Sequence, residues 1–88
     1  MQQDALIINK LGLHARASAK LTQLASSFKC EVMLSRNTRR VNAKSIMGVM
    51  MLAAGIGTPL TVRAEGEDER VALDAVIALF DRKFDEGA

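Results

Sequence analysis

The chain has 88 residues, 49% hydrophobic and 25% charged, which indicates one folded domain over residues 1–88 and excludes a disordered linker. The formal net charge of +2 is spread along the chain, and three Phe without Trp or Tyr argue against the stacking surfaces of single-stranded nucleic-acid binders. One Cys excludes an intrachain disulfide and a multi-cysteine metal site, so we expect a reducing compartment, no metal and no cofactor.

The first predicted elements are a strand and a helix joined by a glycine-containing loop. Residues 5–8 form a short apolar run rich in β-branched side chains, which predicts a buried strand. From residue 15 to residue 28, apolar positions recur at intervals of three and four, the spacing of a helix with one buried face. Charged residues interrupt the first twenty positions, so we expect no secretion signal, no membrane span and a cytoplasmic location.

A hairpin and a short helix are predicted next. Residues 31–35 and 39–43 flank a polar turn, which is typical of two strands with one solvated face. Ser45 suits the N-cap of a helix, and the apolar segment 46–53 that follows it predicts that helix. The segment is apolar nearly all round, so its surface belongs either to the core or to an exposed face for a partner.

The last predicted elements complete an α+β fold. Alternation over residues 60–65 predicts a fourth strand, and an acidic start followed by an apolar stripe predicts a third helix over residues 67–84. We assign the acids at 67–69 to the helix dipole and to no chemistry. The order β-α-β-β-α-β-α predicts a two-layer, open-faced sandwich, with three helices on one face of a four-stranded antiparallel sheet.

The only histidine, His14, lies just before the first predicted helix, with Arg16 two residues further on. The first N–H groups of a helix lack intrahelical partners and favour an anion. A neutral imidazole beside such a site is a nucleophile that can take a phosphoryl group. The alternative is that His14 only caps the helix. Lys20, one turn beyond Arg16, either extends the positive field or is solvated.

Two separated motifs resemble the HPr family, the histidine-containing phosphocarriers of the bacterial phosphoenolpyruvate-dependent phosphotransferase system: LGLHAR at residues 11–16 and KSIMGVM at residues 44–50. The resemblance covers essentially the whole chain. It implies that His14 accepts a phosphoryl group on Nδ1 from phosphorylated enzyme I and passes it to IIA domains. It also implies that Arg16 neutralises phosphoryl charge, and that the protein is a carrier rather than a free-standing enzyme.

The resemblance implies further sites. Ser45 resembles a regulatory serine that HPr kinase/phosphorylase modifies, where a phosphate would weaken docking without unfolding the chain. The partner surface would include Lys20, Lys44, Met47 and Met50. The chain departs from the family at Ala17, where proline is usual, and the Ala17 N–H becomes an extra candidate donor to the phosphate.

Three alternatives stay open at this stage. A carrier of the nitrogen-related branch of the family shares the same histidine chemistry. A small nucleic-acid-binding α+β module is motivated by Arg36, Arg39 and Arg40 around the hairpin. A metal chaperone is a third alternative with less support, since one Cys and one His cannot form a closed metal site within the chain. We expect a monomer that meets its partners through one face.

Overall fold

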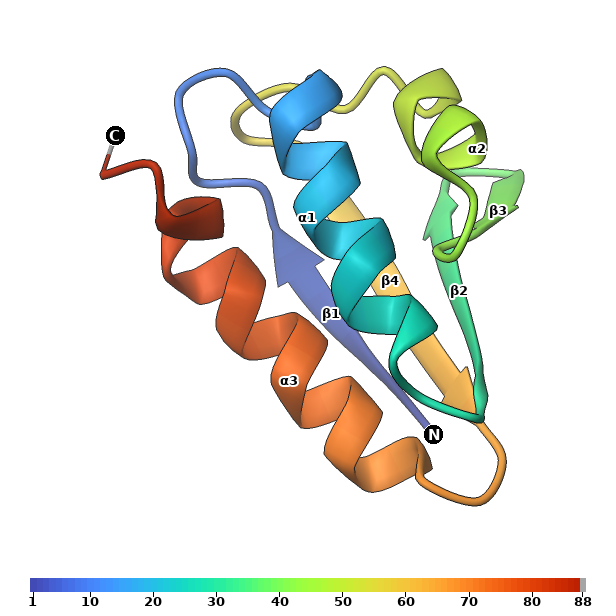
Figure 1. The fold of residues 1–88 in the computed structure, drawn as a ribbon. Coiled ribbons are helices and arrows are strands. Elements are labelled where there is room, and N and C mark those ends of the chain that lie inside the picture. Colours follow the sequence, from blue (N-terminus) through green and yellow to red (C-terminus); the bar gives the residue numbers. More distant parts are fainter. Residues whose placement is uncertain (88) are drawn as a thin grey trace.

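A computed structural model describes residues 1–87, and its elements follow the predicted order (Figure 1). The four strands form an antiparallel sheet in the order β1-β4-β2-β3, with the helices on one face. The predicted two-layer sandwich is therefore confirmed. The elements are β1 (Gln2–Leu6), α1 (Ala15–Ser26), β2 (Glu31–Arg36), β3 (Arg39–Asn42), α2 (Ile46–Met51), β4 (Pro59–Glu65), α3 (Glu69–Asp81) and a 3-10 turn, η1 (Lys83–Asp85).

The core lies between the sheet and the helices and is almost entirely aliphatic. Alternate residues of the two central strands are buried and face the helices: Val32 and Leu34 of β2, and Leu60, Val62 and Ala64 of β4. The buried stripe of α1 includes Leu21, and that of α3 includes Val76 and Phe80. Burying a Val, Leu or Phe side chain stabilises a fold by about 1.5–3 kcal/mol.

The first strand differs from the prediction of a buried strand over residues 5–8. It begins at Gln2 and ends at Leu6, which is 51% exposed. β1 pairs only with β4, so backbone pairing at this edge defines the strand even where its side chains are polar. The buried side chain is Ile7, which follows the strand and exchanges backbone hydrogen bonds with Gly57 and Thr58.

The third helix is shorter than the predicted span of 67–84. It ends at Asp81, and the chain then turns through Lys83, Phe84 and Asp85, whose φ angles are +58°, +54° and +64°. Such left-handed angles are rare in L-residues. Phe84 is fully buried and packs on Phe80 with a ring-centroid distance of 5.0 Å. Burial of this aromatic ring, which helix periodicity does not specify, stabilises the turn and directs the chain back towards α1 (Figure 1).

Asp68 joins the start of α3 to the loop before β2. Its carboxylate accepts hydrogen bonds from the N–H of Lys29 at 3.0 Å and of Cys30 at 2.9 Å, and it makes no cap bond to its own helix. These donors, the Lys29 N–H above all, lower the pKa of Asp68 from 3.8 to about 2. The expectation that this acid serves only the helix dipole was therefore wrong.

Asp68→Asn is expected to lower the melting temperature at neutral pH, because an amide offers one acceptor oxygen where the carboxylate offers two. The lowered pKa means that Asp68 stabilises the fold above about pH 4, and that this stability is lost as the pH falls towards about 2. The difference in melting temperature between wild type and variant should therefore shrink over that range. Thermal unfolding followed by circular dichroism measures it, and a constant difference from pH 6 to pH 2 would contradict the assignment.

In residues 1–87 no helix has the length and apolar character needed to cross a membrane.

Candidate functional site

His14 is the N-cap of α1, as its position in the sequence predicts. Its backbone is extended, with φ −74° and ψ −177°, and its carbonyl accepts the N–H of Ser18 at 2.9 Å. The imidazole folds back over the first turn, so that Nδ1 accepts the N–H of Arg16 at 3.1 Å. The ring is only partly buried, with 28% of the side chain exposed. It therefore combines the capping role with access from solvent.

The loop that leads to His14 depends on Gly12. This residue has φ +64°, and a Cβ there would lie 2.5 Å from the carbonyl oxygen of Ala54. The same carbonyl accepts the N–H of Leu13 at 2.9 Å. Ser18 donates its hydroxyl to the carbonyl of Leu13 at 3.1 Å. These contacts hold the backbone immediately before His14 against the rest of the fold.

Gly12→Ala is expected to destabilise the protein by at least about 1–3 kcal/mol, because the left-handed φ is strained and the added Cβ meets backbone atoms. Gly55→Ala is the matched control, since a Cβ at Gly55 meets no atom within 4 Å. Urea unfolding of both variants measures the difference in free energy of unfolding. Equal stabilities would show that the close approach of the two loops does not matter.

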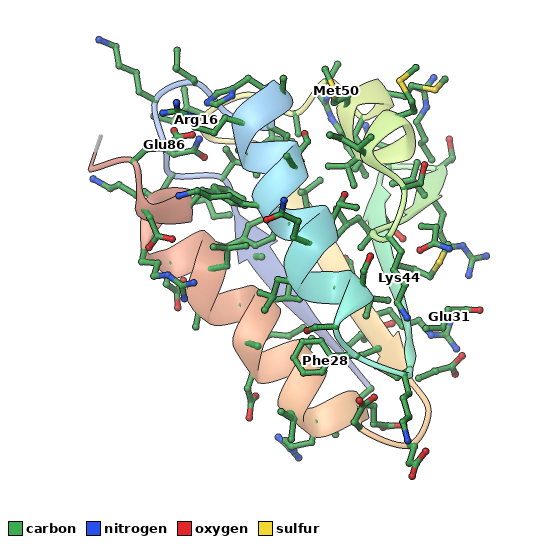
Figure 2. The ribbon with its side chains drawn as sticks, viewed as in Figure 1. Arg16, Phe28, Glu31, Lys44, Met50 and Glu86 are labelled. Carbon is green, nitrogen blue, oxygen red and sulfur yellow. The ribbon has the colours of Figure 1, made fainter. Side chains whose placement is uncertain are left out.

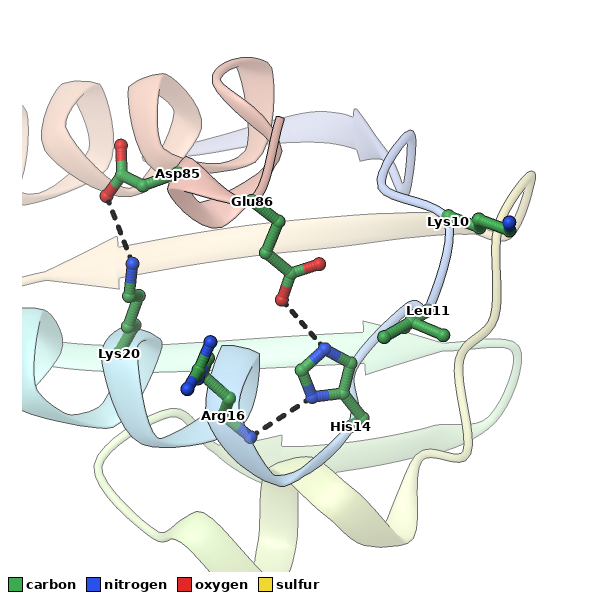
Figure 3. Close-up of a pocket in the computed structure, with 7 residues that line it drawn as sticks. All are labelled: Lys10, Leu11, His14, Arg16, Lys20, Asp85 and Glu86. Carbon is green, nitrogen blue, oxygen red and sulfur yellow. Dashed lines mark hydrogen bonds and ion pairs between the residues drawn. The ribbon is translucent and has the colours of Figure 1, made fainter. Parts of the chain in front are cut away.

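The second ring nitrogen of His14 faces a residue that the sequence did not single out. Oε2 of Glu86 lies 2.7 Å from Nε2, in direct polar contact but outside the angular range of an aligned hydrogen bond (Figure 3). Glu86 follows η1, beyond the predicted end of the third helix. Only the left-handed turn brings it to α1, so no sequence pattern could have identified it.

Two cations near His14 have different environments. The Arg16 guanidinium is exposed and makes no hydrogen bond or ion pair with any residue of the described part of the chain. Lys20 donates Nζ to the carbonyl of Phe84 at 3.0 Å and lies 3.6 Å from Asp85, so its charge is partly compensated. Of these two cations, Arg16 is the one that remains available to a ligand beside the imidazole (Figure 3).

An open hollow of about 600 Å³ collects these groups on one side of the molecule. Its lining is Lys10, Leu11, His14, Arg16, Lys20, Asp85 and Glu86. Ala17 does not line the hollow and is fully buried. The Ala17 N–H, a candidate donor to the phosphate in the sequence analysis, is therefore not open to a ligand. The residue packs in the core instead. The donor nearest the imidazole is the Arg16 N–H.

The α2 helix presents a mostly apolar surface. Ser45 is its N-cap, as predicted, with Oγ accepting the N–H of Gly48 at 3.1 Å. Val49 is its only buried residue, whereas Met47 is 68% exposed and Met50 40%. Of the two alternatives left open by the sequence, exposure therefore describes this helix better than burial in the core.

Lys44 directly precedes Ser45 at the start of α2, and it does not line the hollow around His14. Its Nζ donates to the carbonyl of Phe28 at 2.7 Å, at the end of α1 remote from His14 (Figure 2). Arg16 and Met50, on α1 and α2, both lie toward the opposite end of the sandwich in the same view. The Lys44 side chain is therefore directed to the far end of α1 and away from His14.

The arginines of the hairpin have a structural role. Arg36 donates to the carbonyls of Leu52 and Ala53 at 2.8 and 3.0 Å, and Arg39 donates to that of Met51 at 2.6 Å. These bonds satisfy carbonyls at the C-terminal end of α2. Two of the three arginines behind the nucleic-acid alternative are therefore engaged within the fold. Within residues 1–87, no group of three or more His, Cys, Asp or Glu side chains is arranged to hold a metal ion.

Comparison with known proteins finds similar chains of one family. A family model described as the PTS HPr component phosphorylation site matches residues 1–82. The phosphocarrier protein HPr of Cupriavidus necator is 63% identical over 99% of this chain and 98% of its own. The phosphocarrier protein NPr of Shewanella violacea is 43% identical over 100% and 97%. A crystal structure of HPr-C-His from Thermoanaerobacter tengcongensis covers 98% of this chain and 97% of its own, with 41% identity and a TM-score of 0.94.

Proposed function

The chain belongs to the HPr family and is a phosphocarrier protein, and from this premise we propose that His14 carries the phosphoryl group on Nδ1. The observation that supports the proposal is the placement of a partly exposed imidazole at the N-terminus of α1, beside an arginine without a partner in residues 1–87. Both features favour an added anion at this nitrogen. A purely capping histidine would not need the free cation.

The transfer step follows from the geometry of the ring. The Nδ1 lone pair attacks the phosphorus, the bond between phosphorus and the donor atom of enzyme I breaks, and the donor atom keeps that electron pair. The Arg16 N–H, which now donates to Nδ1, is then free to donate to a phosphoryl oxygen. The Arg16 guanidinium neutralises charge on the other oxygens. Phosphoryl transfer needs this positioning and charge compensation more than it needs covalent help.

We propose that the partners are phosphorylated enzyme I as donor and IIA domains as acceptors, in the cytoplasm. The hollow around His14 and the exposed methionines Met47 and Met50 form the docking surface. A surface that combines exposed apolar and charged side chains suits a small, transient interface. The same surface serves both partners in turn, because both must reach one imidazole nitrogen.

The test is transfer of labelled phosphoryl from phosphoenolpyruvate through purified enzyme I to this protein, followed by addition of IIA domains. We expect acid-labile, alkali-stable label on the protein that IIA then removes. The sugar-branch IIA should discharge it faster than a nitrogen-branch IIA, since identity is 63% to the HPr of Cupriavidus necator and 43% to the NPr of Shewanella violacea. Preference for the nitrogen-branch IIA would instead assign the protein to that branch.

We also propose that Ser45 is a regulatory phosphorylation site for HPr kinase/phosphorylase. The residue is exposed and adjoins the apolar face of α2, while its Oγ accepts the Gly48 N–H. A phosphate at a helix N-terminus is tolerated by the fold, but here it would bring charge and bound water into the docking surface.

Ser45→Asp is expected to raise the KM of enzyme I for this protein by about 10-fold or more, because it places a carboxylate in the docking surface. This change is equivalent to about 1.4 kcal/mol of docking free energy. The fold should be unchanged, since Asp is also a good N-cap. Ser45→Ala is the control: it loses a cap, at about 1 kcal/mol of stability, and keeps the wild-type KM. Steady-state kinetics with enzyme I decides, and equal KM values for the Asp variant and wild type would refute the regulatory role.

A further inference from the structure

The two nitrogens of His14 have partners of opposite character. Nδ1 accepts a hydrogen bond from the Arg16 N–H, so it must offer a lone pair. Nε2 lies 2.7 Å from a carboxylate oxygen of Glu86, and two lone pairs at that distance would repel, so Nε2 carries the proton. Both contacts therefore require the same neutral tautomer, in which Nδ1 is the nucleophilic nitrogen.

Glu86 is held in place by Asn9, which is fully buried. Its Nδ2 group donates one hydrogen bond to Oε1 of Glu86 at 3.0 Å and another to the carbonyl of Gly12 at 2.8 Å. Because Oε1 is bound to Asn9, the other oxygen, Oε2, is left to face His14. The Glu86 side chain is only 13% exposed, so little water competes for this carboxylate. Asn9 therefore orients Glu86 from within the fold.

The turn before Glu86 is also specific. The left-handed backbone angles of its three residues are disfavoured in an isolated chain. The turn is stabilised because Phe84 is buried against Phe80 and because Lys20 donates a hydrogen bond to the Phe84 carbonyl. The same turn contacts α1, where Lys20 binds the Phe84 carbonyl. Local strain that is compensated by tertiary contacts is frequent where a side chain must be placed accurately.

We propose that Asn9 and Glu86 are positioning residues that hold His14 in the Nε2–H tautomer and thereby direct the phosphoryl group to Nδ1. This inference rests on His14 being the acceptor. When Nδ1 forms its bond to phosphorus, the ring becomes cationic, the Nε2 proton stays in place, and the Glu86 carboxylate balances the new positive charge. When the phosphoryl group leaves, the electron pair of the N–P bond returns to Nδ1, and the same neutral tautomer is restored.

Glu86→Gln tests the proposal without changing the size of the side chain. Its one amide oxygen cannot both accept from Asn9 and face Nε2 of His14, so the preference for one tautomer should weaken. Asn9→Ala should have the same effect, because the Glu86 carboxylate is then no longer oriented. Asn9→Ala also leaves a small buried space, so if this variant folds poorly, Glu86→Gln is the variant that decides. Asp81→Asn, at an exposed carboxylate on α3, is the control for loss of a negative charge.

The first readout is nitrogen-15 NMR of the His14 ring at alkaline pH. We expect one Nε2–H tautomer in wild type and in Asp81→Asn, and a mixture in Glu86→Gln and Asn9→Ala. The second readout is the ring position and rate of phosphorylation by enzyme I. The rate on Nδ1 should fall by about 10-fold in both positioning variants, the scale of outer partners of a functional histidine.

The outcomes separate the inference from the proposed function. Variants that keep the single tautomer and accept phosphoryl on Nδ1 at the wild-type rate would overturn the positioning role alone. Failure of wild type to accept phosphoryl on His14 would overturn the proposed function, whatever the tautomer. A shifted tautomer together with a slower Nδ1 reaction supports the inference.

Discussion

His14→Ala is expected to abolish acceptance of a phosphoryl group from enzyme I while leaving the fold intact. No other histidine exists in the chain to replace it. The imidazole also accepts the Arg16 N–H as a cap, so the variant should lose only about 1 kcal/mol of stability. Labelling with phosphoenolpyruvate and enzyme I should give background incorporation, and circular dichroism should show a folded protein.

The variant offers a second, independent observation. Its docking surface on α2 and around the hollow is unchanged, so it should still bind enzyme I and compete with wild type. Adding an excess of His14→Ala to a wild-type reaction should therefore slow phosphorylation of the wild-type protein. Full labelling of the folded variant would show that another residue is the acceptor.

Arg16→Ala is expected to lower kcat/KM for phosphoryl acceptance by about 10²–10³-fold, the effect of removing one preorganised group that stabilises transition-state charge. The guanidinium makes no contact within residues 1–87 that the fold depends on, so stability should be unchanged. Arg16→Lys keeps the charge but loses the planar fork of donors and should recover only part of the rate.

Lys10→Ala is the matched control for Arg16, because it removes another cation from the rim of the same hollow, outside the transfer step itself. We expect a much smaller effect on kcat/KM, of the size of a surface charge that steers association. Equal losses in the two variants would mean that Arg16 contributes only to the general positive field. A loss confined to Arg16 would indicate a direct role at the phosphoryl group.

The fold was largely predictable because its patterns are local. Alternation of apolar and polar residues predicted strands, and apolar residues spaced three and four apart predicted helices, which together gave the two-layer sandwich. Ser45 was correctly predicted as an N-cap. The errors were at the edges. β1 is defined by pairing with β4, and the end of α3 by the burial of Phe84, and neither tertiary cause leaves a periodic signal.

The site was predictable only in part. A lone histidine before a helix, followed by an arginine, indicated the anion site, and the structure places both at one hollow. Asn9 and Glu86 were missed because they lie 77 positions apart and meet only after a left-handed turn. Lys44, which the motif grouped with the partner surface, donates a hydrogen bond to the carbonyl of Phe28, a contact that the motif does not reveal.

The central claim, that His14 carries the phosphoryl group, is tested most directly by peptide mapping of the phosphorylated wild-type protein. Trypsin cleaves after Lys10 and Arg16, which releases the segment 11–16 with His14 and without any Ser, Thr or Tyr. Mass spectrometry under alkaline conditions should find the mass of one phosphoryl group on this peptide after reaction with phosphoenolpyruvate and enzyme I. Phosphoryl mass on any other peptide, with this one unmodified, would contradict the account.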